Sequence, residues 1–261
     1  NKDGSLSFEN PRVFQGKGVT TWEGLIKSVR AKVKGTKVKI RLGASSGEWK
    51  AMVADEAART PFAKNIKTVL EKNKLDGIDL DFEWAENEKE YKDYSLAILK
   101  MREVLGDKYL FSVSLHPVCY KISKEAIEAV DFISLQCYGP SPVRFPIEKY
   151  CSDIQMVLEY GIPKEKLVAG VPFYGVTKDN SKKTEAYFNF VQNGLVTSPA
   201  QNEVIYQGDT YVFDGQDNIR IKTRYAKEQK LKGMMSWDLA TDLPLSDSRS
   251  LLKTMTEELR E

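Results

Sequence analysis

The sequence predicts an α/β protein whose parallel β-strands alternate with helices. Short segments with alternating or continuous apolar residues are separated by longer segments in which apolar residues recur every three to four positions. This strand–helix order specifies a parallel sheet with helical crossovers. No linker or low-complexity tract interrupts the order, so we expect one domain over residues 1–261.

Capping residues, prolines and glycines mark the ends of the elements. Thr21 is placed to cap a helix, and Pro61 suits the first turn of another. Gly208 and Asp209 predict the turn of a small hairpin, and residues 43–47 predict a loop. The predicted strands are 37–42, 75–84, 109–115, 131–138, 167–173 and 233–237. The predicted helices are 21–33, one that begins at 60, 88–105, 124–129, 146–160, 182–195, 217–231 and 246–259.

The composition excludes several classes of function. A net charge of +2 gives no electrostatic case for binding nucleic acid. No run approaches 18 apolar residues, so we expect no membrane span. The single histidine, His116, excludes a His-rich metal site. The three cysteines are an odd number without metal-binding spacing, and they predict neither a metal site nor a disulfide framework.

Residues 75–84 form the most informative strand. With a period of two, Asp79, Asp81 and Glu83 lie on one face and the apolar residues between them on the other. Such crowded carboxylates cannot all stay ionised, so we expect one to hold a proton near neutral pH, as a general acid must. The alternative is a half-exposed antiparallel strand with its acidic face in water. That alternative conflicts with the strand–helix order around it.

A closed β/α barrel accounts for this strand. One face of each barrel strand points to the axis, so the three acids would line the axis with Glu83 nearest the C-terminal mouth, where active sites lie. We therefore predict a (β/α)8 TIM barrel. Only six of its eight strands are evident, and the first two are either absent from this chain or hidden in residues 1–20. We favour their absence, so the predicted domain is incomplete at its N-terminal side.

Residues 76–83 also carry a family signature. They read Asp-Gly-Ile-Asp-Leu-Asp-Phe-Glu, which resembles the Asp-Gly-x-Asp-x-Asp-x-Glu motif of glycoside hydrolase family 18 at all five fixed positions. This family contains chitinases and endo-β-N-acetylglucosaminidases. Residues 130–138, 169–175 and 233–237 resemble the sixth, seventh and eighth strands of the family's barrel. The resemblance covers nearly the whole chain and places Asn1 just after the family's second strand.

The resemblance implies a retaining, substrate-assisted mechanism, an exception to the usual two-carboxylate scheme. Glu83 would protonate the glycosidic oxygen and later act as a base on water. Asp81 would orient the substrate's 2-acetamido group, whose oxygen attacks the anomeric carbon. Asp79 would share a proton with Asp81. Tyr138 would hydrogen-bond the acetamido oxygen.

Four further residues are candidates for binding the sugar. Trp237 would form the apolar floor beneath it, and Gln136 shares the strand face of Tyr138. Tyr174 is expected either to line the cleft or to pack in the core. His116 is expected either to face the sugar or to lie in a solvated loop. The resemblance implies neither a metal nor an organic cofactor.

The sequence departs from the family pattern in two places. The third strand of many relatives ends Ser-x-Gly-Gly, whereas residues 41–44 read Arg-Leu-Gly-Ala. An aspartate often follows the sixth-strand tyrosine, whereas residue 139 is glycine. The second change removes one hydrogen-bond partner of the acid cluster.

The predicted function is cleavage of β-1,4-linked N-acetylglucosamine, in chitin oligomers or in the chitobiose core of N-glycans. One alternative is a non-catalytic chitinase-like carbohydrate-binding protein, although such relatives usually lose the acid that Glu83 supplies. Another is a metal-dependent enzyme, although adjacent positions on one strand converge poorly on one ion. The expected partner is a polysaccharide or oligosaccharide of N-acetylglucosamine, with no nucleic acid and no membrane.

The expected setting of the protein follows from the same resemblance. We expect a monomer that is secreted, attached to the cell surface or periplasmic. The chain begins at Asn1 without a visible signal peptide, which fits an earlier removal of one.

Overall fold

The computed structural model describes residues 1–8, 18–45, 47–139, 145–179 and 183–261. The chain divides into two compact units. Unit 1 comprises Asn1–Ser114 and Lys121–Asp131, and unit 2 comprises Leu115–Tyr120 and Phe132–Glu261. Residues 1–8 and 18–20 contain no strand. The rest of the N-terminal stretch in which we considered hidden strands lies outside the described residues, as does part of the loop predicted at 43–47.

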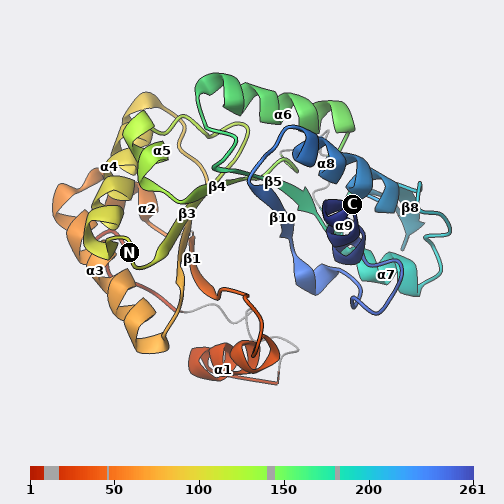
Figure 1. The fold of residues 1–261 in the computed structure, drawn as a ribbon, viewed down its shortest axis with the longest axis horizontal. Helices are drawn as coiled ribbons and strands as arrows, with labels where there is room; N and C mark the ends of the chain where they lie inside the picture. Colours follow the sequence, from red (N-terminus) through yellow and green to blue (C-terminus); the bar gives the residue numbers. More distant parts are fainter. Residues whose placement is uncertain (9–17, 46, 140–144, 180–182) are drawn as a thin grey trace. The chain divides into compact units, whose positions relative to one another are not determined.

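Unit 1 contains three parallel strands that are hydrogen-bonded in the order β1-β2-β3 (Figure 1). These strands are β1 (Arg41–Ser45), β2 (Gly77–Asp81) and β3 (Leu110–Leu115). The helices of unit 1 are α1 (Trp22–Lys32), α2 (Trp49–Ala54), α3 (Glu56–Asn73), α4 (Glu88–Leu105) and α5 (Lys124–Ala129). The register places Asp79 of β2 between Gly43 of β1 and Ser112 of β3.

The core of unit 1 lies between β2 and the helices. Phe82 follows β2 and contacts three aromatic rings: Trp49 of α2 at 5.1 Å, Phe62 of α3 at 6.0 Å and Tyr94 of α4 at 5.5 Å between ring centroids. Such aromatic contacts add to the stabilisation from burying apolar surface. The apolar face of this strand therefore meets helices.

Unit 2 contains three more parallel strands and a separate antiparallel sheet. The parallel strands are β4 (Phe132–Leu135), β5 (Leu167–Pro172) and β10 (Gly233–Trp237), with β5 in the middle. The antiparallel sheet has the order β7-β6-β9-β8, built from β6 (Tyr174–Thr177), β7 (Thr184–Ala186), β8 (Glu203–Tyr206) and β9 (Asp209–Val212). The helices are α6 (Ile147–Tyr160), α7 (Tyr187–Gln192), α8 (Gln216–Glu228), α9 (Leu251–Arg260) and the 3₁₀ helix η2 (Leu239–Thr241).

A fully buried ion pair ties α8 to the core of unit 2. The Nζ of Lys222 donates to Oδ2 of Asp214 at 2.6 Å and to the carbonyl oxygen of Phe145 at 2.8 Å, and neither charged side chain is exposed. Asn218 donates to the other oxygen of Asp214 at 3.1 Å. Burial raises the pKa of Asp214, and the charge of Lys222 opposes that rise. Phe145 belongs to the apolar cluster that contains Tyr138.

The predicted alternation of strands and helices is confirmed, with three parallel strands in each unit. The boundaries of β1 were predicted wrongly. Residues 41–45 form β1, because they pair with β2 from Arg41 beside Gly77 to Ser45 beside Asp81. The start of the predicted loop at Gly43 therefore belongs to the strand.

Other predicted boundaries also need correction. The helix expected to begin at residue 60 begins at Glu56, since the Asp55 side chain accepts a hydrogen bond from the backbone N–H of Ala57 at 2.9 Å. Helix α2 and strand β6 were not predicted at all. The hairpin turn lies at Gln207 and Gly208, where φ is 52° and 87°, one residue earlier than expected.

Three predicted elements are shorter than expected. The helix predicted at 182–195 is α7, which strand β7 precedes. The strand predicted at 131–138 ends with β4, and the last helix begins at Leu251. In the described part of the chain, none of the helices has the length and apolar character needed to cross a bilayer.

Candidate active site

The acidic face of β2 is open on the side that the sequence predicts. Ile78 and Leu80 are fully buried, whereas Asp79 and Asp81 are half-buried. Glu83 follows two residues after the last residue of β2 and is exposed. The predicted alternation is confirmed, and the acidic residues become more accessible toward the carboxyl end of the strand.

Trp49 holds the backbone that carries Glu83. Its indole Nε1 donates to the carbonyl oxygen of Glu83 at 3.3 Å, and its ring stacks on Phe82 with an angle of 14° between the planes. The peptide bond between Glu83 and Trp84 is cis. Sequence reasoning missed Trp49 because α2 was not predicted, although Met52 and Val53 lie at helical spacing from it.

Gly77 is required by the pairing of β2 with β3. A Cβ atom on Gly77 would lie 1.9 Å from the carbonyl oxygen of Leu110, which no side chain permits. The same pairing places Ser112 beside Asp79. The glycine of the family motif thus allows the close approach that brings hydroxyl groups to the acidic face.

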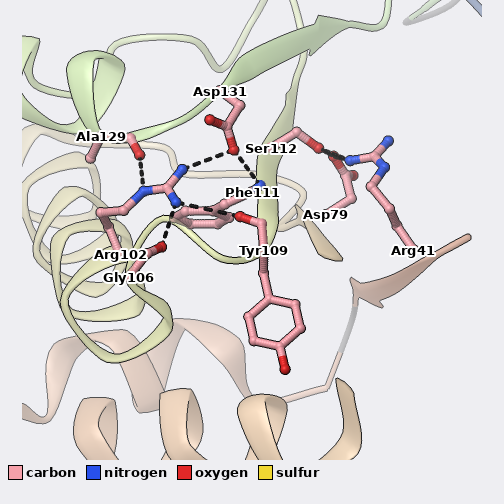
Figure 2. A network of polar contacts seen from close by, with 9 residues as sticks. All are labelled: Arg41, Asp79, Arg102, Gly106, Tyr109, Phe111, Ser112, Ala129 and Asp131. Carbon is pink, nitrogen blue, oxygen red and sulfur yellow. Dashed lines mark hydrogen bonds and ion pairs between the residues drawn. The ribbon is translucent and has the colours of Figure 1, made fainter. Parts of the chain in front are cut away.

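Asp79 is surrounded by donors from both neighbouring strands (Figure 2). The hydroxyl of Ser114 donates to its Oδ2 at 2.8 Å, and the hydroxyl of Ser112 donates to its Oδ1. The Nη1 of Arg41 lies 3.7 Å from the same Oδ1 and also donates to the oxygen of Ser112. Both oxygens of Asp79 therefore have partners.

Arg41 brings a half-buried positive charge to this face. Its side chain is 25% exposed, and that of Asp79 is 17% exposed. Burial lowers the pKa of Arg41, and the negative charges of Asp79 and Asp131 oppose that change. Because an arginine side chain stays protonated in proteins, the charge is permanent.

Tyr138 packs in the core of unit 2. It is 7% exposed and clusters with Phe145 and Val176. Its hydroxyl donates to the sulfur of Met235 at 3.8 Å, a weak acceptor, and its ring meets that of Tyr174 edge-on with 6.4 Å between centroids. The structure therefore brings Tyr138 and Tyr174 together.

Trp237 and Gln136 differ sharply in exposure. Trp237 is the last residue of β10 and is 54% exposed, so its ring offers an open apolar surface. Its carbonyl oxygen accepts from the backbone N–H of Phe173 at 2.8 Å. Gln136 is buried, and its backbone N–H donates to the carbonyl oxygen of Leu115 at 2.8 Å.

His116 fills the space beside Gly139. His116 is 2% exposed, so the alternative of a solvated loop histidine is wrong. Its Nδ1 accepts from the backbone N–H of Val118 at 3.3 Å, so the neutral ring carries its proton on Nε2. A Cβ atom on Gly139 would lie 2.9 Å from that Nε2. The histidine therefore occupies the volume that a side chain after Tyr138 would need.

The eight predicted site residues divide between the two units. Unit 1 holds Asp79, Asp81 and Glu83, and unit 2 holds His116, Gln136, Tyr138, Tyr174 and Trp237. Across the described residues, no group of three acidic, histidine or cysteine side chains is arranged to hold a metal ion. The metal-dependent alternative thus has no ligand set in this part of the chain.

The two serines whose hydroxyl groups contact Asp79 were not predicted as site residues. Ser112 and Ser114 alternate with apolar residues in β3, and both donate to Asp79. Two small polar residues on one face of a buried parallel strand need hydrogen-bond partners, and this pattern could have indicated both serines as site residues. Arg41 was visible in the sequence only as a departure from the family pattern.

Parallel strands that alternate with helices, with carboxylates at the carboxyl end of one strand, define an enzyme-like β/α-barrel protein. Comparison with known proteins narrows this class. The model of the family Glycosyl hydrolases family 18 matches residues 2–242. The chain belongs to this family, as its signature predicts.

Individual relatives are distant in sequence. The chain is 23% identical over 273 residues to "Probable chitinase 2" of Drosophila melanogaster, an alignment that covers 79% of this chain and 56% of the relative. It is 23% identical to "Chitinase A1" of Niallia circulans, which covers 92% of this chain and 47% of that relative. The chain thus spans about half the length of these curated relatives.

Solved structures show the fold. A chitinase from Bacteroides thetaiotaomicron matches with a TM-score of 0.83 and 21% identity, covering 98% of this chain and 84% of the other. The chitinase-like agglutinin RobpsCRA from Robinia pseudoacacia matches with a TM-score of 0.76 and 19% identity, covering 90% of this chain and 84% of the other. The predicted TIM-barrel fold class, with six strands evident, is confirmed.

Proposed function

We propose that this chain hydrolyses β-1,4-linked N-acetylglucosamine, in chitin oligomers or in the chitobiose core of N-glycans. The observation that carries the proposal is strand β2, with the half-buried Asp79 and Asp81 followed by the exposed Glu83. A general acid must reach the glycosidic oxygen, and an exposed carboxyl group after the C-terminal end of a parallel strand supports this role for Glu83.

The proposed reaction retains configuration at the anomeric carbon. Glu83 gives its proton to the glycosidic oxygen while the bond between that oxygen and the anomeric carbon breaks. The acetamido oxygen of the same sugar attacks the anomeric carbon and forms an oxazolinium ion, whose positive charge Asp81 stabilises. Glu83 then takes a proton from water, whose oxygen opens the oxazolinium ring.

Residues of unit 2 have proposed roles in binding. The hydroxyl group of Tyr138 donates a hydrogen bond to the acetamido oxygen, and Trp237 provides an apolar surface for the sugar ring. The exposure of Trp237, 54% for the whole residue, supports a role in contacting a ligand. The ligand class follows from membership of the family. Action as a monomer outside the cytoplasm stays a prediction.

The test is turnover of a chromogenic chitobioside by the wild-type chain and by Glu83→Gln. We expect the substitution to lower kcat by about 10³-fold, because general acid catalysis contributes roughly 10²–10⁴-fold. Glu86→Gln is the matched control, since Glu86 is an exposed acid three residues away that pairs with Lys50 at 3.2 Å. Equal activity of wild type and Glu83→Gln would contradict the proposal.

A non-catalytic carbohydrate-binding protein is the second candidate. The similarity to a chitinase-like agglutinin favours it, as does glycine at position 139, where relatives often have aspartate. Calorimetric titration with a chitin oligomer separates the two candidates. Saturable binding without release of product by the wild-type chain supports the binding protein, and release of product supports the hydrolase.

A further inference from the structure

The proposed reaction gives no role to the guanidinium of Arg41, which pairs with Asp79 on the acidic face of unit 1. In the β1–β2 register, Arg41 lies beside Gly77 and Gly43 lies beside Asp79. Residues side by side in parallel strands point to the same face of the sheet, so Arg41 shares the face of Asp79. A polar residue that faces the acids from a neighbouring strand can act on them directly.

The contacts of Arg41 are directed at the inner acid (Figure 2). Its Nη1 donates to the hydroxyl oxygen of Ser112, which in turn donates to Oδ1 of Asp79. The ion pair between Nη1 and that Oδ1 spans 3.7 Å. Hydrogen bonds that involve an ionised partner are the strong ones, so this relay fixes both the position and the surroundings of Asp79.

A second carboxylate also acts on Arg41 but has a partner of its own. The charge of Asp131 opposes the effect of burial on Arg41. Oδ2 of Asp131 accepts from Nη2 of Arg102 at 2.9 Å and from the backbone N–H of Phe111 at 2.7 Å. Asp131 is therefore paired with Arg102, and of the two carboxylates that act on Arg41, Asp79 has the larger effect.

We propose that Arg41 is a positioning residue of the acidic strand, which balances the charge of Asp79 and leaves Asp81 and Glu83 to carry the proton used in catalysis. This inference rests on the proposed function. It replaces our expectation that Asp79 shares a proton with Asp81. Alternate residues of a strand are about 6.6 Å apart, so a fixed cation at one end of the row acts on all three acids.

The first test is the pH profile of kcat/KM for the chromogenic chitobioside in Arg41→Met and Arg41→Lys. Loss of the positive charge favours the protonated forms of the acids, so both limbs of the profile should move to higher pH by about 0.5–1 pH unit in Arg41→Met. We expect kcat to fall by about 10–100-fold with little change in KM. Arg41→Lys keeps the charge and should keep both limbs.

Ser112→Ala is the matched control because it removes the bridging hydroxyl without changing a charge. It should lower kcat, and because it removes a hydrogen bond but no charge, it should move the limbs by less than Arg41→Met does. If Arg41→Met lowers kcat while its limbs coincide with those of wild type, Arg41 has only a structural role and the inference is wrong.

The second test needs no turnover. The free energy of unfolding is measured for Arg41→Met, Asp79→Asn and the double variant. A charge pair predicts that Arg41→Met costs about half as much or less in the Asp79→Asn background as in wild type. Additive losses overturn the inference. If the losses are coupled but the wild-type chain releases no product, the proposed function fails, the catalytic part of the inference fails with it, and Arg41–Asp79 is an ion pair of the fold.

Discussion

Two arginines contact strand β3 or the residues beside it, and they bind different kinds of acceptor (Figure 2). Arg102 donates mainly to backbone carbonyl oxygens, those of Ala129 at 2.6 Å, Gly106 at 2.8 Å and Tyr109 at 3.4 Å. Arg41 instead donates to a side-chain hydroxyl and pairs with the carboxylate of Asp79.

The two arginines differ in the chemistry of their partners. The carbonyls bound by Arg102 lie at the end of α4, at the end of α5 and just before β3, so one planar side chain fastens three segments. The carboxylate partner of Arg102, Asp131, is not part of the proposed active strand, so we expect this arginine to contribute to folding. The partners of Arg41 include an acid of the proposed active strand, so its loss should appear in the chemistry as well.

The largest expected effect is that of Arg102→Ala on stability. Truncation leaves several carbonyls without their donor and the Asp131 carboxylate without its pair, and it should lower the free energy of unfolding by about 2–4 kcal/mol. Arg102→Lys should recover only part of this loss, because one ammonium group cannot reach carbonyls on three segments. Urea unfolding measures both variants.

The same variants sharpen the comparison with Arg41. The pH limbs of activity should stay in place in Arg102→Lys, since the catalytic acids keep their own neighbours. A lysine variant as stable as wild type would mean that the charge of Arg102 matters and its fork of donors does not. A shift of the limbs in that variant would mean that the two arginines do not differ in kind.

A smaller effect is expected from Asp131→Asn. Asp131 is 40% exposed in its side chain, and its Oδ2 accepts from both Arg102 and the backbone N–H of Phe111. The amide keeps an acceptor for one of these donors but loses the charge, so unfolding should become easier by about 0.5–1.5 kcal/mol. A loss as large as that of Arg102→Ala would show that the ion pair, and not the carbonyl contacts, holds the segments.

The elements predicted well are those whose signals are local. The helix at 88–105 was predicted with the observed boundaries, and the side chain of Asn87 caps it by accepting from the backbone N–H of Glu90 at 3.0 Å. The bounds of β1 depend on its pairing with β2, which lies more than 30 residues away, and no local signal marks them. Helix α2 is only six residues long, too short for a clear apolar period.

In the candidate site too, the features set by local sequence were predicted and those set by distant contacts were not. The alternation of Asp79, Asp81 and Glu83 follows from the period of a strand, so the acidic face was predictable from one segment. The relay from Arg41 through Ser112 to Asp79 joins three strands and depends on their register. The close approach of His116 to Gly139 likewise joins residues that are distant in sequence, so the departure at 139 was visible but its neighbour was not.

The smallest expected effect comes from a third arginine, which lies at the surface of unit 2. Arg249 donates from Nε to Oδ1 of Asp247 at 3.0 Å and from Nη2 to Oδ2 at 2.8 Å. Hydrogen bonds from this side chain and then from the backbone N–H of Arg249 lower the pKa of Asp247 to about 2. In an unfolded chain, the pKa of an aspartate is about 3.9.

Because the folded form binds the proton less tightly, the pair stabilises the fold above about pH 4 and loses this contribution as the pH falls toward about 2. The Arg249 side chain is 48% exposed, so screening by water and salt keeps the contribution small. Asp247→Asn should therefore lower the free energy of unfolding slightly at pH 6, and the difference from wild type should shrink with acid or with 1 M salt. A difference that persists in acid would arise from the turn geometry around Asp247. In that case Asp247 contributes through the hydrogen bond that it accepts from the backbone N–H of Arg249, and not through its charge.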